Sequence, residues 1–144
     1  MTITFNDALI REMGDWLEAA YPHEACGFMI GSVEGESRTV QQLVPVENRS
    51  TENLRRRFVI DPLDYLRAER QADEDQQVLL GVFHSHPDHP AVPSEHDLAS
   101  AQPFFSYVIA SIEAGSMTTI KSYRLRDAAF AEEILNITKE SIVL

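Results

Sequence analysis

Two histidines and an aspartate in the middle of the sequence are of the types that bind a metal ion. His84 and His86 follow an apolar run over residues 78–83 that is typical of a buried strand. Side chains two positions apart on a strand point to the same side, so both imidazoles can reach one ion. A proline-rich loop then leads to Asp97, which can return as a third ligand. Such a set leaves a zinc position open for water, which is typical of a catalytic site.

The segment from Ser94 to Asp97 also has the pattern of a helix start. Serine is a preferred N-cap residue, and Asp97 stands three residues later, in the first turn, where the helix dipole favours a carboxylate. A capping role is therefore an alternative to metal binding. The two roles are compatible, because a first-turn carboxylate can serve both.

The spacing of these residues resembles the signature of the JAMM (MPN+) metalloproteases. In that signature, His-Ser/Thr-His is followed after seven residues by serine and after two more by aspartate, and His84-Ser-His86, Ser94 and Asp97 match it without departure. The family also has an upstream glutamate, and Glu24 lies where it is expected. The resemblance covers the chain from about residue 5 to about residue 143.

The resemblance implies a role for each of these five residues. His84, His86 and Asp97 would bind one zinc ion per chain. Glu24 would act as general base towards the zinc-activated water and pass the proton to the leaving amine, and Ser94 would donate a hydrogen bond to the oxyanion. The predicted reaction is hydrolysis of an amide bond. Judged on composition alone, Glu24 is instead an exposed loop carboxylate.

The short chain is similar to the small stand-alone prokaryotic members of the family, and this implies a partner. Such members act on ubiquitin-like sulfur-carrier proteins at the C-terminal Gly-Gly, where they remove an amino-acid extension or release cysteine. Two alternatives stay open. One is a zinc hydrolase with an unrelated amide substrate, and the other is a non-catalytic MPN-type protein-binding scaffold, although such scaffolds have lost metal ligands that this sequence retains.

Length and composition indicate a single domain over residues 1–144. The net charge of −11 argues against binding to nucleic acid or to an anionic membrane. The sequence has no apolar run of membrane-spanning length and no signal-peptide pattern, and its single cysteine fits a reducing compartment, so we expect a cytoplasmic protein. Apolar neighbours favour Cys26 as a buried core thiol rather than a nucleophile.

The first helix is expected to begin at Asn6 or Asp7, after a short lead-in over residues 1–5, and to run to about Ala20. Tyr21 and Pro22 end it, because a residue before proline avoids the helical region. Helical spacing predicts one buried stripe, made of Leu9, Met13, Trp16, Leu17 and Ala20.

The rest of the sequence alternates between strand and helix patterns. Strands are predicted over residues 25–31, 39–46, 58–60, 78–83, 104–110, 118–125 and 132–138, and helices over 62–75 and from 94 to about 101. The expected fold class is α/β, with one mixed sheet flanked by helices. The resemblance implies the same fold, similar to that of cytidine deaminases, but the deaminase signature His-x-Glu with Pro-Cys-x-x-Cys is absent, so deamination is not supported.

Two groups of residues have no place in the signature. Three consecutive arginines, Arg55, Arg56 and Arg57, form a basic cluster in an acidic chain, as either a solvated face or a contact for an acidic protein partner. The remaining histidines are His23, His89 and His96. His89 either lines the cleft or is simply exposed, and His23, beside Glu24, either steers substrate or packs.

Overall fold

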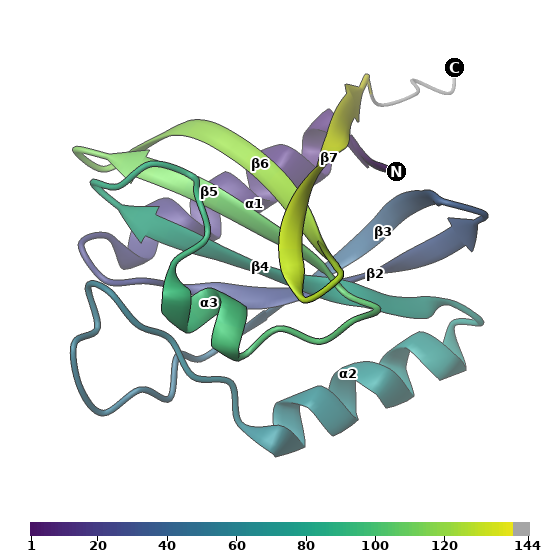
Figure 1. Ribbon diagram of the computed structural model, residues 1–144, viewed down its shortest axis with the longest axis horizontal. Coiled ribbons are helices and arrows are strands. Elements are labelled where there is room, and N and C mark those ends of the chain that lie inside the picture. Colours follow the sequence, from purple (N-terminus) through teal and green to yellow (C-terminus); the bar gives the residue numbers. More distant parts are fainter. Residues whose placement is uncertain (140–144) are drawn as a thin grey trace.

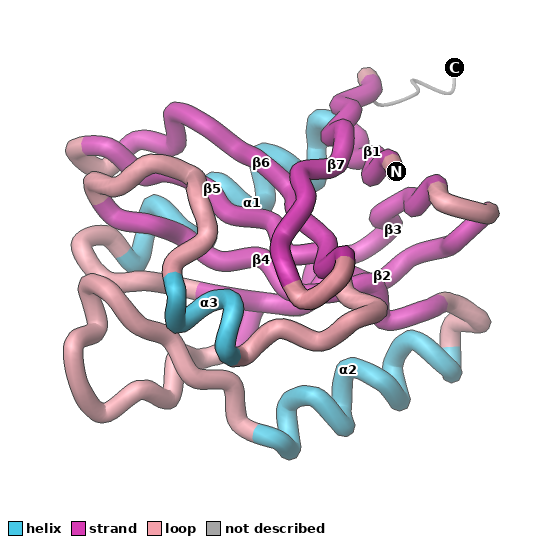
Figure 2. Tube along the Cα trace, in the orientation of Figure 1, coloured by secondary structure: helices cyan, strands magenta, loops and turns pink. Residues whose placement is uncertain are grey.

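The computed structural model describes residues 1–139, which form a seven-stranded mixed sheet that closes on itself (Figures 1 and 2). The strands are β1 (Thr2–Asn6), β2 (Cys26–Glu34), β3 (Ser37–Val46), β4 (Val78–Pro87), β5 (Ser106–Glu113), β6 (Ser116–Arg126) and β7 (Ala129–Thr138). The helices are α1 (Asp7–Ala20), α2 (Pro62–Glu74) and α3 (Glu95–Ala99). The spatial order of the strands is β1-β3-β2-β4-β5-β6-β7.

Pairing of β1 with both β3 and β7 closes the sheet. Both pairings are parallel, and they include Thr2 opposite Ser37 and Thr2 opposite Ile134. The prediction of a mixed sheet with helices is confirmed, but the prediction of a short lead-in over residues 1–5 is wrong. Ile3 and Phe5 point into the core with no exposed surface, which fixes this segment as a strand. The expected likeness to cytidine deaminases stays a prediction.

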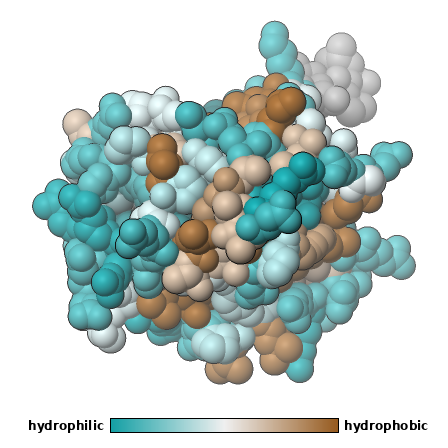
Figure 3. All heavy atoms as spheres, viewed as in Figure 1, coloured by the Kyte–Doolittle hydropathy of each residue, from teal (hydrophilic) through white to brown (hydrophobic). Residues whose placement is uncertain are grey.

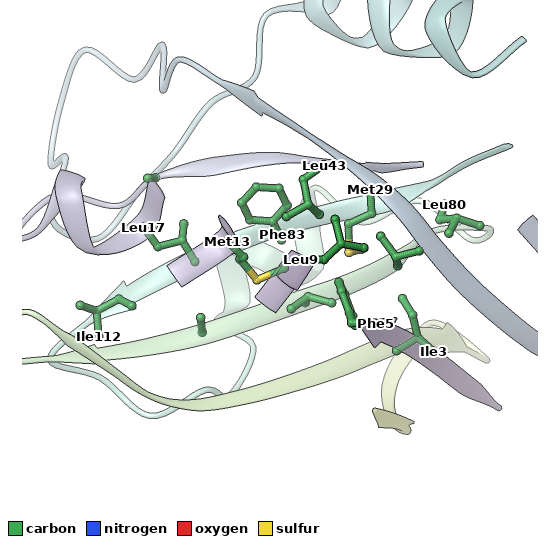
Figure 4. Close-up of a cluster of buried hydrophobic side chains, with 14 residues drawn as sticks. Ile3, Phe5, Leu9, Met13, Leu17, Met29, Leu43, Leu80, Phe83 and Ile112 are labelled. Carbon is green, nitrogen blue, oxygen red and sulfur yellow. The ribbon is translucent and has the colours of Figure 1, made fainter. Parts of the chain in front are cut away.

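The amphipathic helix α1 covers one face of the strands and supplies part of the main hydrophobic core (Figure 4). The predicted cap is confirmed, because the Asn6 side chain accepts a hydrogen bond from the Leu9 amide at 2.8 Å. Met13 and Leu17 are fully buried against the strands. The prediction that Trp16 is buried is wrong. The residue is 38% exposed, and its indole N–H donates to the Cys26 carbonyl at 3.0 Å.

Helix α2 packs on the opposite face of β2 and β4, along the lower edge in Figure 1. Its predicted start is confirmed, because the Asp61 side chain caps the Leu63 amide at 2.8 Å and Pro62 takes the first helical position. The small side chains Ala68 and Ala72 are buried between the helix and the sheet. The central strands are therefore covered on both faces, which explains their nearly unbroken apolar sequences.

Strand β4 lies between β2, to which it is antiparallel, and β5, to which it is parallel. Gly81 has φ of +156°, and a Cβ atom there would lie 1.9 Å from the Ser106 carbonyl oxygen, so only glycine fits this close approach. Beyond Gly81 the strand alternates regularly. Phe83 joins the core beneath α1, whereas Val82 joins the cluster beneath α2. His84 and His86 continue the face of Val82.

Two predicted segments, residues 58–60 and the end of α3, differ from the structure. Residues 58–60 are not a strand, because Val59 bonds to the Arg49 amide and the Asn48 side chain instead of a neighbouring strand. Helix α3 ends at Ala99, earlier than expected. The strand predicted over residues 132–138 is confirmed as β7, and residues 140–144 of the last segment lie outside the described residues. Among residues 1–139, no helix has the length and hydrophobicity needed to cross a bilayer.

Truncation of a core side chain of α1 should destabilise the fold. We expect Met13→Ala to lower the free energy of unfolding by about 2–5 kcal/mol, because Met13 has no exposed surface and its loss leaves a cavity. Glu12→Ala on the exposed side of the same helix should change it by less than about 0.5 kcal/mol. Urea unfolding of both variants measures the difference. Equal effects would contradict the packing of α1 described above.

Candidate metal centre

The side chains of His84, His86 and Asp97 meet at the end of β4. The two Nε2 atoms of the histidines are 3.2 Å apart. The Asp97 carboxylate oxygens lie 3.3 Å from Nε2 of His84 and 3.2 Å from Nε2 of His86. One possible ligand atom from each residue lies within 4.8 Å of the others, and all three residues are buried. The structure thus brings together the three residues that the sequence singled out as ligands.

The start of α3 fixes the Asp97 carboxylate. Ser94 Oγ accepts a hydrogen bond from the Asp97 amide at 3.0 Å, and Asp97 Oδ2 accepts one from the Ser94 amide at 2.9 Å. This reciprocal capping box is the helix start that the spacing predicted. The same carboxylate also faces the two histidines, so capping and a contribution to the cluster coexist. Capping therefore orients the group that would bind a metal.

Hydrogen bonding prepares the histidines for a metal ion. The Nδ1–H of His86 donates to the Pro90 carbonyl at 2.9 Å, a partner that can only accept, so Nε2 is the ring nitrogen that faces Asp97 and is placed to bind a metal. Burial lowers the pKa of His84 and favours its neutral form. Burial alone would raise the pKa of Asp97, but hydrogen bonds with both histidines hold it below its usual range.

The donor set fits a divalent metal ion. Two imidazole nitrogens and a carboxylate oxygen converge from buried side chains, and a cation between them would balance the negative charge and accept the lone pairs. The chemistry of this set is that of zinc and similar transition metals.

Phe58 positions His84 but was not recognised from the sequence. Its ring lies 4.5 Å from the His84 imidazole, centroid to centroid, at 31°. Nδ1 of His84 is buried without a hydrogen-bond partner among residues 1–139, so packing rather than hydrogen bonding orients this ring. Phe58, Tyr65, Val82 and Tyr107 line an apolar cavity of about 200 Å³ beside His84. Phe58 stands at no regular sequence spacing from His84 on β4, so no sequence pattern indicated this contact.

Glu24 lies two residues before the start of β2 and is only 5% exposed. The interpretation from composition, an exposed loop carboxylate, is wrong. The Glu24 amide donates to the Leu54 carbonyl at 2.7 Å, and its carbonyl accepts from the Asn48 side chain at 3.1 Å. Burial raises the pKa of its carboxyl to about 8. Its side chain lines a cavity of about 620 Å³ together with His86 and Ser94.

Ser85, between the two histidines, holds the segment of Glu24 against β4. Its hydroxyl accepts from the Ala25 amide at 2.9 Å, and its own amide donates to the Ala25 carbonyl at 3.0 Å. The side chain is fully buried on the face opposite the imidazoles. No separate role for Ser85 was recognised from the sequence. The signal was a hydroxyl residue enclosed by two histidines on a strand.

The other residues singled out in the sequence lie around this centre. Cys26 is a free, fully buried thiol whose pKa burial raises to about 12, which confirms the core interpretation. His89 and His96 line the cavity beside Glu24, so the interpretation of His89 as a cleft residue is confirmed. His23 is exposed. The three arginines are exposed too, on the loop between β3 and α2, where Figure 3 shows a strongly hydrophilic surface at the left.

Comparison with known proteins assigns the family. Residues 6–126 match the prokaryotic homologues of the JAB domain. The chain belongs to this family. It is 30% identical over 133 residues to the CysO-cysteine peptidase of Mycobacterium tuberculosis, a match that covers 92% of this chain and 88% of that protein. A second relative is the "probable TtuB-protein conjugate cleaving protease" of Thermus thermophilus, 32% identical over 101 residues, with 70% of this chain and 64% of that protein covered.

The fold of this chain is also found in a solved structure. A protein of Desulfitobacterium hafniense, determined in solution, superimposes with a TM-score of 0.85 at 32% identity. The superposition covers 96% of this chain and 94% of that one. The resemblance to the JAMM family drawn from the sequence signature is thus confirmed at the level of the family and of its fold.

Removal of any of the three candidate ligands should abolish metal binding. We expect the unaltered protein, loaded with zinc and desalted, to hold one ion per chain, and His84→Ala and Asp97→Asn to hold almost none, because two donors bind far more weakly than three. Elemental analysis by mass spectrometry gives the metal content. His23→Ala, which changes an exposed histidine outside the cluster, is the matched control. Full zinc occupancy in the Asp97 variant would contradict this ligand set.

Proposed function

We propose that this chain is a zinc-dependent peptidase, with residues 1–144 as a single catalytic domain. It would hydrolyse the amide bond after the C-terminal Gly-Gly of a ubiquitin-like carrier protein. The observation that carries the proposal is the cavity of about 620 Å³ in which the buried Glu24 carboxyl faces the same space as His86 and Ser94. A proton acceptor, a candidate metal ligand and a hydroxyl donor thus border one volume that an extended peptide can enter.

Glu24 would transfer the proton in this reaction. His84, His86 and Asp97 would hold the zinc ion, which when bound supplies a Lewis acid that polarises the scissile carbonyl. The Glu24 carboxylate takes one proton from water as the water oxygen bonds to the carbonyl carbon. When the C–N bond breaks, the leaving nitrogen takes that proton from Glu24, and the products are a carboxylic acid and an amine. A pKa raised towards neutrality suits a group that both accepts and returns a proton.

Ser94 would stabilise the negative charge that develops on the carbonyl oxygen. In the capping box its oxygen accepts a hydrogen bond, so its own O–H proton is not used by the helix start. The side chain is exposed and borders the cavity of Glu24. The hydroxyl can therefore cap α3 and donate to the substrate at the same time.

The relatives support the choice of substrate. One is named for its action on CysO-cysteine, and another for cleavage of TtuB–protein conjugates. Both names describe cleavage of a conjugate. The charge of −11 adds no support for a nucleic-acid substrate.

Glu24→Gln tests the proton-transfer role. We expect this variant to bind zinc as the unaltered protein does, because Glu24 is not among the three ligands, but to lose at least about 100-fold in turnover, because the amide cannot accept the proton. Metal content and the rate of carrier cleavage are measured on the same sample. Unchanged turnover with zinc bound would remove Glu24 from the mechanism.

The substrate is tested with bacterial ubiquitin-like carriers that bear residues or cysteine after Gly-Gly. We expect the zinc-loaded protein to cleave immediately after Gly-Gly, as seen in the intact mass of the carrier, with no cleavage after chelation or in Glu24→Gln. Carriers that stay intact at full zinc occupancy would overturn the assignment of the substrate. Cleavage that persists after chelation would overturn the metal dependence.

A further inference from the structure

One cation at the candidate active site has no ion-pair partner among residues 1–139. Of the three consecutive arginines, Arg55 pairs with Asp88 at 3.9 Å and Arg57 pairs with Glu52 at 3.6 Å. Within residues 1–139, no carboxylate lies within ion-pair distance of Arg56, although the sequence has 23 acidic and only 12 basic residues. With acidic groups in such excess, a guanidinium that stays unpaired at the edge of a cavity is available for a ligand.

Arg56 lies on the side of the site where Glu24 acts. Both residues line the cavity of about 620 Å³, and His89 lines it too. The charge of Arg56 also acts on the Glu24 carboxyl. Burial raises the pKa of Glu24, and the charge of Arg56 acts in the opposite direction, so the guanidinium is near enough to influence the carboxyl. An anion bound to Arg56 would therefore sit close to the group that returns the proton.

The direction of proton transfer indicates which part of the substrate occupies the cavity lined by Glu24 and Arg56. Glu24 returns the proton to the leaving nitrogen, so the leaving group must lie on the side of Glu24. The other cavity, which His84 itself lines, is bordered by Phe58, Tyr65, Val82 and Tyr107 and has no arginine or lysine in its wall. The cationic cavity is therefore the place for the leaving group.

The leaving group that fits a cationic cavity carries a negative charge close to its nitrogen. In a free amino acid the carboxylate carbon is two bonds from the nitrogen, roughly 2.5 Å away. A lysine side chain released from an isopeptide bond instead has only methylene groups next to its nitrogen. Guanidinium groups bind carboxylates with two parallel hydrogen bonds, which makes arginine selective for this group.

We infer that Arg56 binds the α-carboxylate of a single amino acid that follows Gly-Gly, and thereby makes the site selective for release of a free amino acid over cleavage of a lysine-linked conjugate. The inference rests on the proposed function and specifies its leaving group. Arg56 is a specificity-determining residue in this account. It takes no part in proton transfer.

The test compares two carriers that differ only in charge at the end of the chain. Both end in Gly-Gly-Ala, one with a free carboxylate and the other with a C-terminal amide. We expect kcat/KM for the free acid to exceed that for the amide by at least about tenfold, the usual scale of a hydrogen-bonded charge. Arg56→Gln should bring the ratio close to one, and Arg56→Lys should keep part of it. Arg49→Gln is the matched control, because Arg49 is paired with Glu47 at 3.4 Å and does not line this cavity.

A binding measurement separates recognition from turnover. In the Glu24→Gln background, fluorescence anisotropy of labelled carriers should show tighter binding of the free acid than of the amide, and Arg56→Gln should remove the difference. Equal rates and affinities for the two carriers, or a preference that survives Arg56→Gln, would overturn the inference while carrier cleavage itself stands. Absence of both cleavage and binding for either carrier would overturn the proposed function and the inference with it.

Discussion

The pairing of β4 with β2 is the constraint on which the candidate site depends. Cys26 lies opposite His84 in this ladder, and one residue beyond it Ala25 and Ser85 exchange two hydrogen bonds. This register brings Glu24 to the cavity that His86 lines, although about 60 residues separate them in the sequence. A slip of one residue would turn both imidazoles into the core beneath α1. Burial of both faces of β4, by α1 and by α2, prevents that slip.

A second constraint acts from the other side of the cluster. Asp97 reaches the histidines because the capping box with Ser94 holds its carboxylate at the start of α3. A helix of only five residues has little stability of its own, so the cap and the cluster support each other. Ser94 thus links the local structure to the chemistry, since the hydroxyl that begins the helix also borders the cavity of Glu24.

The sequence predicted the elements with strong periodicity and those with distinct end signals. The cap at Asn6, the Asp61-Pro62 start and the alternation of His84 and His86 are local patterns, and each survived in the structure. Features set by distant contacts were missed. The predicted lead-in is strand β1, because it pairs with β3 and β7. Trp16 is not buried in the core, because its indole N–H donates to the Cys26 carbonyl. The burial of Glu24 and the stacking of Phe58 on His84 also depend on tertiary packing, which no spacing encodes.

The central claim is that β4 and the start of α3 build a metal site with Glu24 beside it. A crystal structure of the zinc-loaded protein, with anomalous diffraction recorded at the zinc absorption edge, tests this most directly. We expect one anomalous peak between His84, His86 and Asp97, with the Glu24 carboxylate facing the same space but not bound to the ion. A peak elsewhere, or Glu24 in place of Asp97 among the ligands, would contradict it.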